Sequence, residues 1–339
     1  MIELRDDSLV FRFPDHHRNA VLSIDFQRTL RIPDDGKEYP LPPGLGRFTL
    51  RHVDDFSRRL PPAWKERGGV MLPMYRAEAL WMNFDSAYIP NYDTEYPFAV
   101  KVGTGKICAI SGKPWSETLH RRPQDYLSVP EQPWLDGYCV EKGFIRQFVA
   151  MPLGEGYTAE EQLTGKAEFG GLQIMVFPMR RDMFEARFPE RKERFMEPEG
   201  CMCYSNMAMG MAPGGRMHQE IYEDPYKKSD WDIKAGLRVF VHLADAILWR
   251  AITGQIPPAS PLTAREYGDA DGSWFSYENE RARVVDGSPR LAELKSILAK
   301  ANEKGDPPPA DLAPVKSDPI ITIKRPKRGR RRRDSFWKE

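Results

Sequence analysis

Proline is the residue that most restricts how this chain can fold. Thirty of the 339 residues are proline, about 9 %, which is nearly twice the average share. Clusters such as Pro40-Leu41-Pro42-Pro43 and Pro307-Pro308-Pro309 recur along the chain. Each proline fixes φ and lacks an amide donor, so long helices and uninterrupted sheets are disfavoured. We therefore expect short helices and strands joined by stiff, ordered loops.

The rest of the composition predicts a large folded core. Hydrophobic residues make up 41 % of the chain, and eight Trp, 13 Tyr and 17 Phe are too many for a mainly disordered protein. The four cysteines are unevenly spaced, which excludes a small disulfide scaffold and favours reduced thiols. The first residues lack the basic and apolar regions of a secretory signal, and the most apolar stretch, 237–252, is too short and too charged to span a membrane. We expect a soluble, cytoplasmic protein.

Strand patterns dominate the first half of the sequence. Alternating or β-branched runs predict strands at the following positions: 8–13, 21–26, 144–151 and 171–177. Residues 98–102 and 106–110, separated by Gly103-Thr104-Gly105, are typical of a hairpin. A short helix is expected at 158–165, because Thr158 and Glu161 form a capping-box pattern and Gly165 can end the helix.

Helical patterns are stronger in the second half. Apolar residues repeat at three- and four-residue intervals over 237–252, which predicts an amphipathic helix there. A later helix is expected from Pro289 to Gly305, with Ser288 as its cap. The fold class is therefore α+β, with a β-rich first half, a helix-richer second half and proline-rich loops. We expect one body at 1–305, which allows two packed subdomains near 1–180 and 181–305.

The clearest boundary lies after Gly305. Residues 306–323 are proline-rich and predict an extended linker, and residues 324–339 form a basic tail. The tail carries a formal charge of +7, whereas the whole chain is +1, so the remainder carries −6. Blocks of like charge repel one another and stay disordered, and they often contact partners. The basic side chains concerned are Lys324, Arg325, Lys327, Arg328, Arg330, Arg331, Arg332 and Arg333.

This tail predicts an electrostatic partner. The expected partner is an acidic protein or a polyanion. If the polyanion is a nucleic acid, binding should not depend on its sequence, because a basic segment contacts phosphates rather than bases. A tail that only improves solubility, or one that binds the acidic body of the same chain, is the alternative interpretation.

One candidate metal or thiol site lies at Cys201-Met202-Cys203. Soft sulfur ligands favour Cu(I), and further Met residues and His218 follow nearby. A structural zinc site is not expected, because a second cysteine pair is missing. Packing of Cys and Met in an irregular core explains the same pattern. The sequence predicts no cofactor.

A second candidate site follows at 213–220. Gly214 and Gly215 predict a turn whose amides, together with Arg216, could bind an anion. His218 and Glu220 are two residues apart, so on a strand they share one face and could act as acid and base. A turn leading into a strand with solvated charges is the alternative.

A third candidate lies on the helix expected at 237–252. His242 and Asp245 are three residues apart and Arg238 is four residues before His242, so the three could form a polar network that orients a catalytic histidine. An ordinary salt bridge on the helix surface is the alternative.

Turn residues alternate with apolar runs over 132–154, a pattern found both in pocket walls and in ordinary joints between strands and loops. Arg146 is the candidate anion ligand in this segment. The segment 132–154 and the stretch 40–48 resemble microbial proteins that carry no assigned activity. The resemblance implies neither a catalytic residue nor a ligand.

Known catalytic motifs do not decide the function. Gly103-Thr104-Gly105-Lys106 and Ser111-Gly112-Lys113 do not match the P-loop, and no nucleophile elbow or kinase motif is present. The leading hypothesis is a non-enzymatic interaction or assembly protein with an acidic body and a cationic tail. The alternatives are an enzyme with a pocket around Arg216, His218 and His242, and a soft-metal or thiol site at Cys201 and Cys203.

Overall fold

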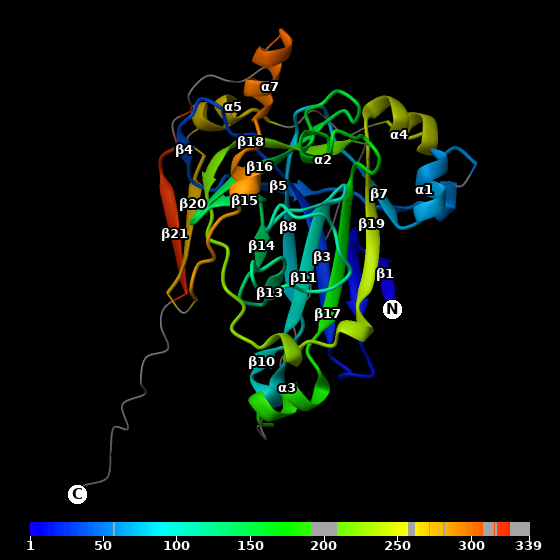
Figure 1. Ribbon diagram of the computed structural model, residues 1–339, viewed down its shortest axis with the longest axis vertical. Coiled ribbons are helices and arrows are strands. Elements are labelled where there is room, and N and C mark those ends of the chain that lie inside the picture. Colours follow the sequence, from blue (N-terminus) through cyan, green and yellow to red (C-terminus); the bar gives the residue numbers. More distant parts are fainter. Residues whose placement is uncertain are drawn as a thin grey trace, which may run out of the picture.

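The computed structural model describes residues 1–56, 58–190, 209–256, 262–270, 272–280, 282–307, 315 and 317–325. Two large sheets and several short helices make up this part of the chain, so the α+β class is confirmed (Figure 1). Two small two-stranded sheets complete the strands.

The larger sheet has ten strands. Its main path, in spatial order, is β1 (Ile2–Arg5), β2 (Ser8–Arg12), β3 (Val21–Thr29), β8 (Ala79–Ser86), β16 (Phe144–Met151), β18 (Gly210–His218) and β4 (Glu38–Tyr39). Three shorter strands attach beside this path: β5 (Gly44–Arg47), β14 (Trp134–Leu135) and β15 (Gly137–Glu141).

The smaller sheet has seven strands. Its path is β12 (Ile107–Cys108), β11 (Phe98–Thr104), β17 (Leu172–Pro178), β19 (Leu237–Ala244), β7 (Val70–Pro73) and β6 (Arg51–His52), and β13 (Leu127–Val129) pairs with β11. The two-stranded sheets are β9 (Tyr88–Ile89) with β10 (Thr94–Glu95), and β20 (Trp274–Asn279) with β21 (Ile320–Arg325).

One hydrophobic core joins the two large sheets. Leu22, Ile24 and Phe26 alternate along β3, as expected for a strand with one buried face, and they belong to the same cluster as Ile174 and Val176 of β17. Every residue of β17 is buried, because this strand lies in the middle of the smaller sheet.

The helices are short, as the proline content predicts. They are α1 (Pro62–Arg67), α2 (Ala159–Thr164), α3 (Arg181–Arg187), α4 (Ala246–Thr253), α5 (Ala264–Asp269), α6 (Pro289–Ala292) and α7 (Ile297–Lys304), and the 3₁₀ turns are η1 (Asp54–Phe56), η2 (Pro90–Tyr92), η3 (Lys228–Asp230) and η4 (Ile233–Ala235). Within the described ranges, no helix has the length and apolar character needed to cross a membrane.

Several local predictions are confirmed. The capping box of Thr158 and Glu161 starts α2, and Gly165 ends this helix in the left-handed conformation. A hairpin forms between β11 and β12 as expected, but Gly103 and Thr104 belong to β11, so the turn is at 105–106 and not at 103–105. Pro213 lies inside β18 at a position where the pairing with β16 shifts register, so its missing amide falls at an irregularity of the ladder.

The helix expected at 237–252 is wrong. The first half of this stretch is strand β19, which pairs with β17 and β7, and helix α4 starts only at Ala246. A buried central strand and a buried helix both give long apolar runs, so periodicity did not separate them. The helix expected from Pro289 to Gly305 is two helices, α6 and α7, although Ser288 and Gly305 cap the predicted ends.

The predicted border between linker and tail falls inside a strand. Residues 320–325 form β21, which pairs in parallel with β20 over six residues. Lys324 and Arg325, the first two basic residues of the tail, therefore belong to a strand. Residues 326–339 lie outside the described residues.

Candidate functional site

The structure brings two predicted anion ligands together. Arg146 of β16 and Arg216 of β18 are directly opposite each other in the larger sheet. Gly214 and Gly215 lie inside β18 and do not form the expected turn. Glycine is needed at 215 because a Cβ atom there would lie 2.4 Å from the carbonyl oxygen of Pro33.

Carboxylates of the same chain already neutralise these two arginines. The Arg216 guanidinium contacts Glu38 at 3.2 Å and also pairs with Glu141. Arg146 lies 3.8 Å from Asp34, and burial lowers the pKa of its guanidinium, while Asp34 opposes this shift. The cluster is an ion-pair network, so an added anion would have to displace internal carboxylates.

The two predicted catalytic histidines lie on strands of different sheets. His218 ends β18, where its exposed ring meets the Phe144 ring edge to face, with 5.4 Å between the ring centroids. His242 lies in β19, is 3 % exposed and stacks on Trp64. The His242 Nε2 atom lies 3.0 Å from the carbonyl oxygen of Gly68, and burial lowers the pKa of this ring to about 4.

The remaining predicted polar residues have structural roles where the structure describes them. The Asp245 side chain accepts a hydrogen bond from the amide of Leu248 and caps α4, so it does not join His242 on a helix. The Glu220 carboxylate accepts a hydrogen bond from the Tyr222 hydroxyl at 3.1 Å.

Cys201 and Cys203 lie outside the described residues. The part of the chain that the structure describes contains no cluster of three His, Cys, Asp or Glu side chains suited to a metal ion. Cys108 and Cys139 are free and buried, and burial raises the pKa of the Cys139 thiol to about 12. Both described thiols are thus protonated near neutral pH.

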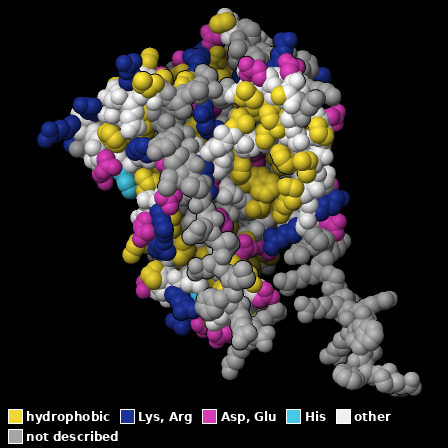
Figure 2. All heavy atoms as spheres, turned by 180° about the vertical axis from the view of Figure 1, so that it is seen from behind, with side chains coloured by type: hydrophobic (Ala, Val, Ile, Leu, Met, Phe, Trp, Pro, Cys, Tyr) yellow, Lys and Arg dark blue, Asp and Glu magenta, His cyan; other side chains and the backbone are white. Residues whose placement is uncertain are grey.

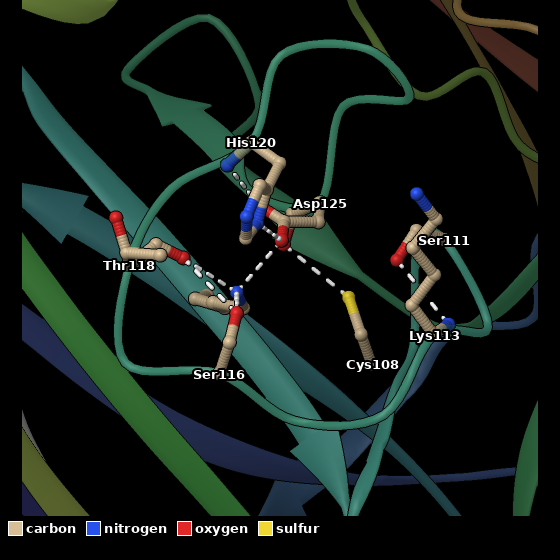
Figure 3. Close-up of polar contacts among 8 residues, drawn as sticks. Cys108, Ser111, Lys113, Ser116, Thr118, His120 and Asp125 are labelled. Carbon is tan, nitrogen blue, oxygen red and sulfur yellow. Dashed lines mark hydrogen bonds and ion pairs between the residues drawn. The ribbon is translucent and has the colours of Figure 1, made fainter.

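A buried lysine was missed by the sequence analysis. Lys101 of β11 is 0 % exposed, and its ammonium group donates three hydrogen bonds to Ser116, Thr118 and Asp125, which Figure 3 labels. The acceptors are Asp125 Oδ2 at 2.7 Å, Ser116 Oγ at 2.9 Å and the carbonyl oxygen of Thr118 at 2.6 Å. A buried charge requires such partners. Because its three donors are used and its side chain is enclosed, Lys101 anchors the loop that contains Ser116, Thr118 and Asp125 and is not placed to act as a nucleophile.

Asp125 extends the anchor to a histidine. Its Oδ1 atom accepts a hydrogen bond from the amide of His120 at 2.8 Å, and its Oδ2 atom lies 2.8 Å from His120 Nδ1. The Cys108 thiol donates to the carbonyl oxygen of Asp125. These contacts close the segment 120–125 on itself and tie its Asp125 end to β11 through Lys101 and to β12 through Cys108 (Figure 3).

The anchored segment forms one wall of a cavity of about 570 Å³, which we call the arginine-lined cavity. Its lining consists of Ile110, Ser111, Arg121, Arg122, Pro123, Gln124, Glu223, Arg283, Val285, Asp286, Gly287, Ser288 and Pro289. The volume is within the range of small-molecule sites. Three stretches far apart in the sequence build the cavity, so no local motif could reveal it.

The three arginines of this cavity differ in their partners. Arg121 donates to the carbonyl oxygens of Asp224 and Tyr226, which fix its guanidinium. Arg122 and Arg283 are exposed, and their side chains have no hydrogen bond or ion pair with any residue that the structure describes. Two cationic groups at this cavity are therefore available to a ligand.

The first basic residues of the tail lie at a defined place on the surface. Lys324 pairs with Glu278 of β20 at 2.9 Å, and the Arg325 guanidinium donates to the carbonyl oxygen of Pro130 at 3.2 Å. Sheet β20–β21 lies at one edge of the molecule, opposite α1 and α4 (Figure 1).

A second cavity of about 550 Å³ adjoins Arg325 and has a more acidic lining. Asp93, Glu95 and Glu131 line it together with Arg187 and Arg325. Burial raises the pKa of the Glu95 carboxyl, and Arg325 opposes this shift.

None of the three comparisons with known proteins identifies a relative. No family model matches the chain, and neither a curated protein nor a solved structure shows significant similarity to it.

Proposed function

We propose that this chain is a non-enzymatic interaction protein whose basic C-terminal segment contacts a polyanionic or acidic partner. The basic segment is the run of eight cations from Lys324 to Arg333. The observation that supports this proposal is strand β21, which holds the first two of these cations at a fixed point on the surface.

Strand β21, which carries Lys324 and Arg325, is attached to the body through β20. Strand β20 is tied to the body by two backbone hydrogen bonds of 2.8 Å between Leu41 and Phe275. β21 pairs with β20 along its whole length, which places Arg325 opposite Asn279. Lys324 and Arg325 are therefore on ordered backbone, which lowers the entropy lost when a partner contacts them.

Apolar side chains beside the basic segment support a contact surface. Ile320, Ile321 and Ile323 of β21 are each 47 % exposed. Figure 2 shows hydrophobic side chains gathered on the back face, on the side where β20 and β21 lie. Exposed apolar patches beside charged residues are typical of interaction sites.

The charge distribution favours an electrostatic mode of binding. The basic segment carries eight positive charges in ten residues, whereas the rest of the chain is net acidic. Contacts of this kind neutralise phosphates or carboxylates and release counterions, so the affinity falls steeply with salt. Sequence-specific recognition of bases is not part of the proposal.

The alternatives have less support. The enzyme alternative places Arg216, His218 and His242 around one pocket, whereas His218 is exposed at the end of β18 and His242 is buried in β19 of the other sheet. The soft-metal or thiol site at Cys201 and Cys203 stays a prediction.

The test compares the full chain with two variants of equal charge. In the first variant glutamine replaces the six cations of the basic segment that follow β21: Lys327, Arg328, Arg330, Arg331, Arg332 and Arg333. In the second, glutamine replaces six cations of the body, all of them exposed: Arg5, Arg18, Arg58, Arg59, Lys65 and Arg250.

Binding to a fluorescent single-stranded oligonucleotide is measured by anisotropy at low salt. We expect the first variant to bind at least about tenfold more weakly than the second, because it loses most phosphate contacts. Equal affinities of the two variants would refute the role of the basic segment.

A further inference from the structure

We propose that the arginine-lined cavity binds a phosphate monoester of a hydroxyl-bearing small molecule, such as a sugar phosphate or a nucleotide. This inference does not rest on the proposed function of the basic segment. It rests on which charged groups line the cavity, on which of them lack partners, and on how firmly the walls are held.

The cations of the cavity suit a phosphate group. Arg122 and Arg283 come from different walls, and neither side chain has a partner among the described residues. Arg121 is held nearby by two carbonyl oxygens and lies close to the buried Asp224 carboxyl, where burial raises the pKa of the carboxyl and Arg121 opposes this shift. Guanidinium groups donate paired hydrogen bonds that match the oxygen atoms of phosphate.

The acidic residues of the cavity select against a bare anion. Glu223 and Asp286 also line it, are exposed, and form no side-chain hydrogen bond or ion pair within the described ranges. A carboxylate only accepts hydrogen bonds, so these two groups suit the hydroxyl groups of a ligand and repel a second anionic group. A phosphate ester of a polyol offers both kinds of group in one molecule.

The walls of the cavity are preorganised. The segment that carries Arg121 and Arg122 is anchored by the buried pair of Lys101 and Asp125. On the opposite wall, the Ser288 hydroxyl donates to the carbonyl oxygen of Ser111 at 2.7 Å. Walls that are already ordered reduce the entropy lost when a ligand binds.

The wall that contains Glu223 is tied to the walls formed by 110–124 and 283–289. The Gln124 side chain donates to the carbonyl oxygen of Tyr222 and accepts from the amide of Asp224, which flank Glu223. The amide of Glu223 donates to the carbonyl oxygen of Arg283 at 2.7 Å. All the unpartnered charges thus sit on backbone that hydrogen bonds hold in place.

The cavity lies close to the start of the basic segment, so a phosphate group could also come from a polyanion bound to that segment. The amide of Glu280 donates to the carbonyl oxygen of Arg325, and Arg283 follows three residues later, so the Cα atoms of Glu280 and Arg283 are at most about 11 Å apart. A terminal phosphate of a polyanion bound to the basic segment is therefore the competing occupant.

The test titrates the full chain with ribose 5-phosphate by isothermal titration calorimetry at moderate salt. Ribose, inorganic phosphate and a 5′-phosphorylated oligonucleotide are titrated separately. The test variant is Arg122→Gln combined with Arg283→Gln. The control is Arg59→Gln combined with Arg250→Gln, which removes two exposed arginines near α1 and α4 whose side chains also have no partner among the described residues.

We expect ribose 5-phosphate to bind the full chain and the control alike, and the test variant at least about tenfold more weakly. Ribose should not bind, and inorganic phosphate should bind more weakly than the ester. Glu223→Gln combined with Asp286→Asn should reduce the preference for the ester over inorganic phosphate. Circular dichroism should show the same thermal midpoint for all variants, because the substituted side chains are exposed.

Three results would overturn the inference. The first is the absence of binding by ribose 5-phosphate, and the second is equal affinity for the test and control variants. The third is binding of the 5′-phosphorylated oligonucleotide alone, which would assign the cavity to the end of a polymer. The variant that lacks the six cations after β21 should keep its affinity for ribose 5-phosphate, which separates this inference from the proposed function.

Discussion

Removing the carboxylate of Asp125 should destabilise the fold strongly. Asp125→Ala leaves the Lys101 ammonium fully enclosed, with only Ser116 and Thr118 as acceptors. Breaking one partner of a buried ion pair typically costs 3–5 kcal/mol. The same substitution removes both hydrogen bonds to His120. We therefore expect a loss of about 4 kcal/mol in the free energy of unfolding.

Two further variants test whether the cost comes from the unpaired charge. Lys101→Met combined with Asp125→Leu removes both charges, and we expect it to be at least about 2 kcal/mol more stable than Asp125→Ala. The control is Asp269→Ala, which removes the partner of Arg265 in an exposed pair whose side chains are 76 % and 73 % exposed. The control should change the stability by less than about 1 kcal/mol, because surface ion pairs contribute little.

The assay is urea unfolding at pH 7, followed by far-ultraviolet circular dichroism. A loss below about 1 kcal/mol for Asp125→Ala would refute the reasoning, because it would mean that water or another group compensates the lysine. A double variant no more stable than the single one would also contradict it. In that case the hydrogen bonds of the loop, and not the buried charge, would carry the effect.

Three other substitutions test separate parts of the structure. Burial lowers the pKa of the His242 ring to about 4, so this histidine takes up a proton at a higher pH in the unfolded chain than in the folded one. The free energy of unfolding should therefore fall as the pH drops from about 6.5 to 4. Urea titrations of His242→Phe should show a smaller fall over this pH range. Burial raises the pKa of Asp136 to about 7, so between pH 4 and 7 this carboxyl is protonated in the folded state and ionised in the unfolded state. The free energy of unfolding of the parent chain should therefore fall by about 1.4 kcal/mol per pH unit as the pH rises over this range, relative to that of Asp136→Asn. Gly215→Ala forces a Cβ atom against backbone and should cost about 1–3 kcal/mol, whereas Gly44→Ala, whose nearest contact would be 3.4 Å, should cost less than about 1 kcal/mol in the same assay.

The sequence predicted those parts of the fold whose signals are local. The capping box at Thr158 and the hairpin around Gly103 depend on neighbouring residues, and both are present. The prediction of one helix over 237–252 was wrong because the apolar run continues through a strand and a helix. Only the cap at Asp245 marks the point where the strand ends and the helix begins. Pairing with β17 and β7 decided the outcome, and this pairing is not visible in the stretch itself.

The candidate sites show the same division. Neighbouring turn residues placed Arg146 and Arg216 among the candidates, and the strands do bring them together, but the acids that neutralise them come from elsewhere in the chain. The sequence did contain a signal for Lys101 that was not used. This residue is the one lysine within the apolar strand β11, and a lysine in such a place needs a buried partner. Arg122 and Arg283 had none, because their cavity combines three distant stretches.

The most direct measurement of the central claim is the salt dependence of oligonucleotide binding. For single strands, log K falls against log salt with a slope of about −0.7 per phosphate contact, so eight cations predict a slope of about −5.6 for the full chain. Glutamine at the six positions after β21 should reduce the slope to about −1, which corresponds to Lys324 and Arg325 alone. An unchanged slope in that variant would show that the polyanion contacts some other surface of the protein.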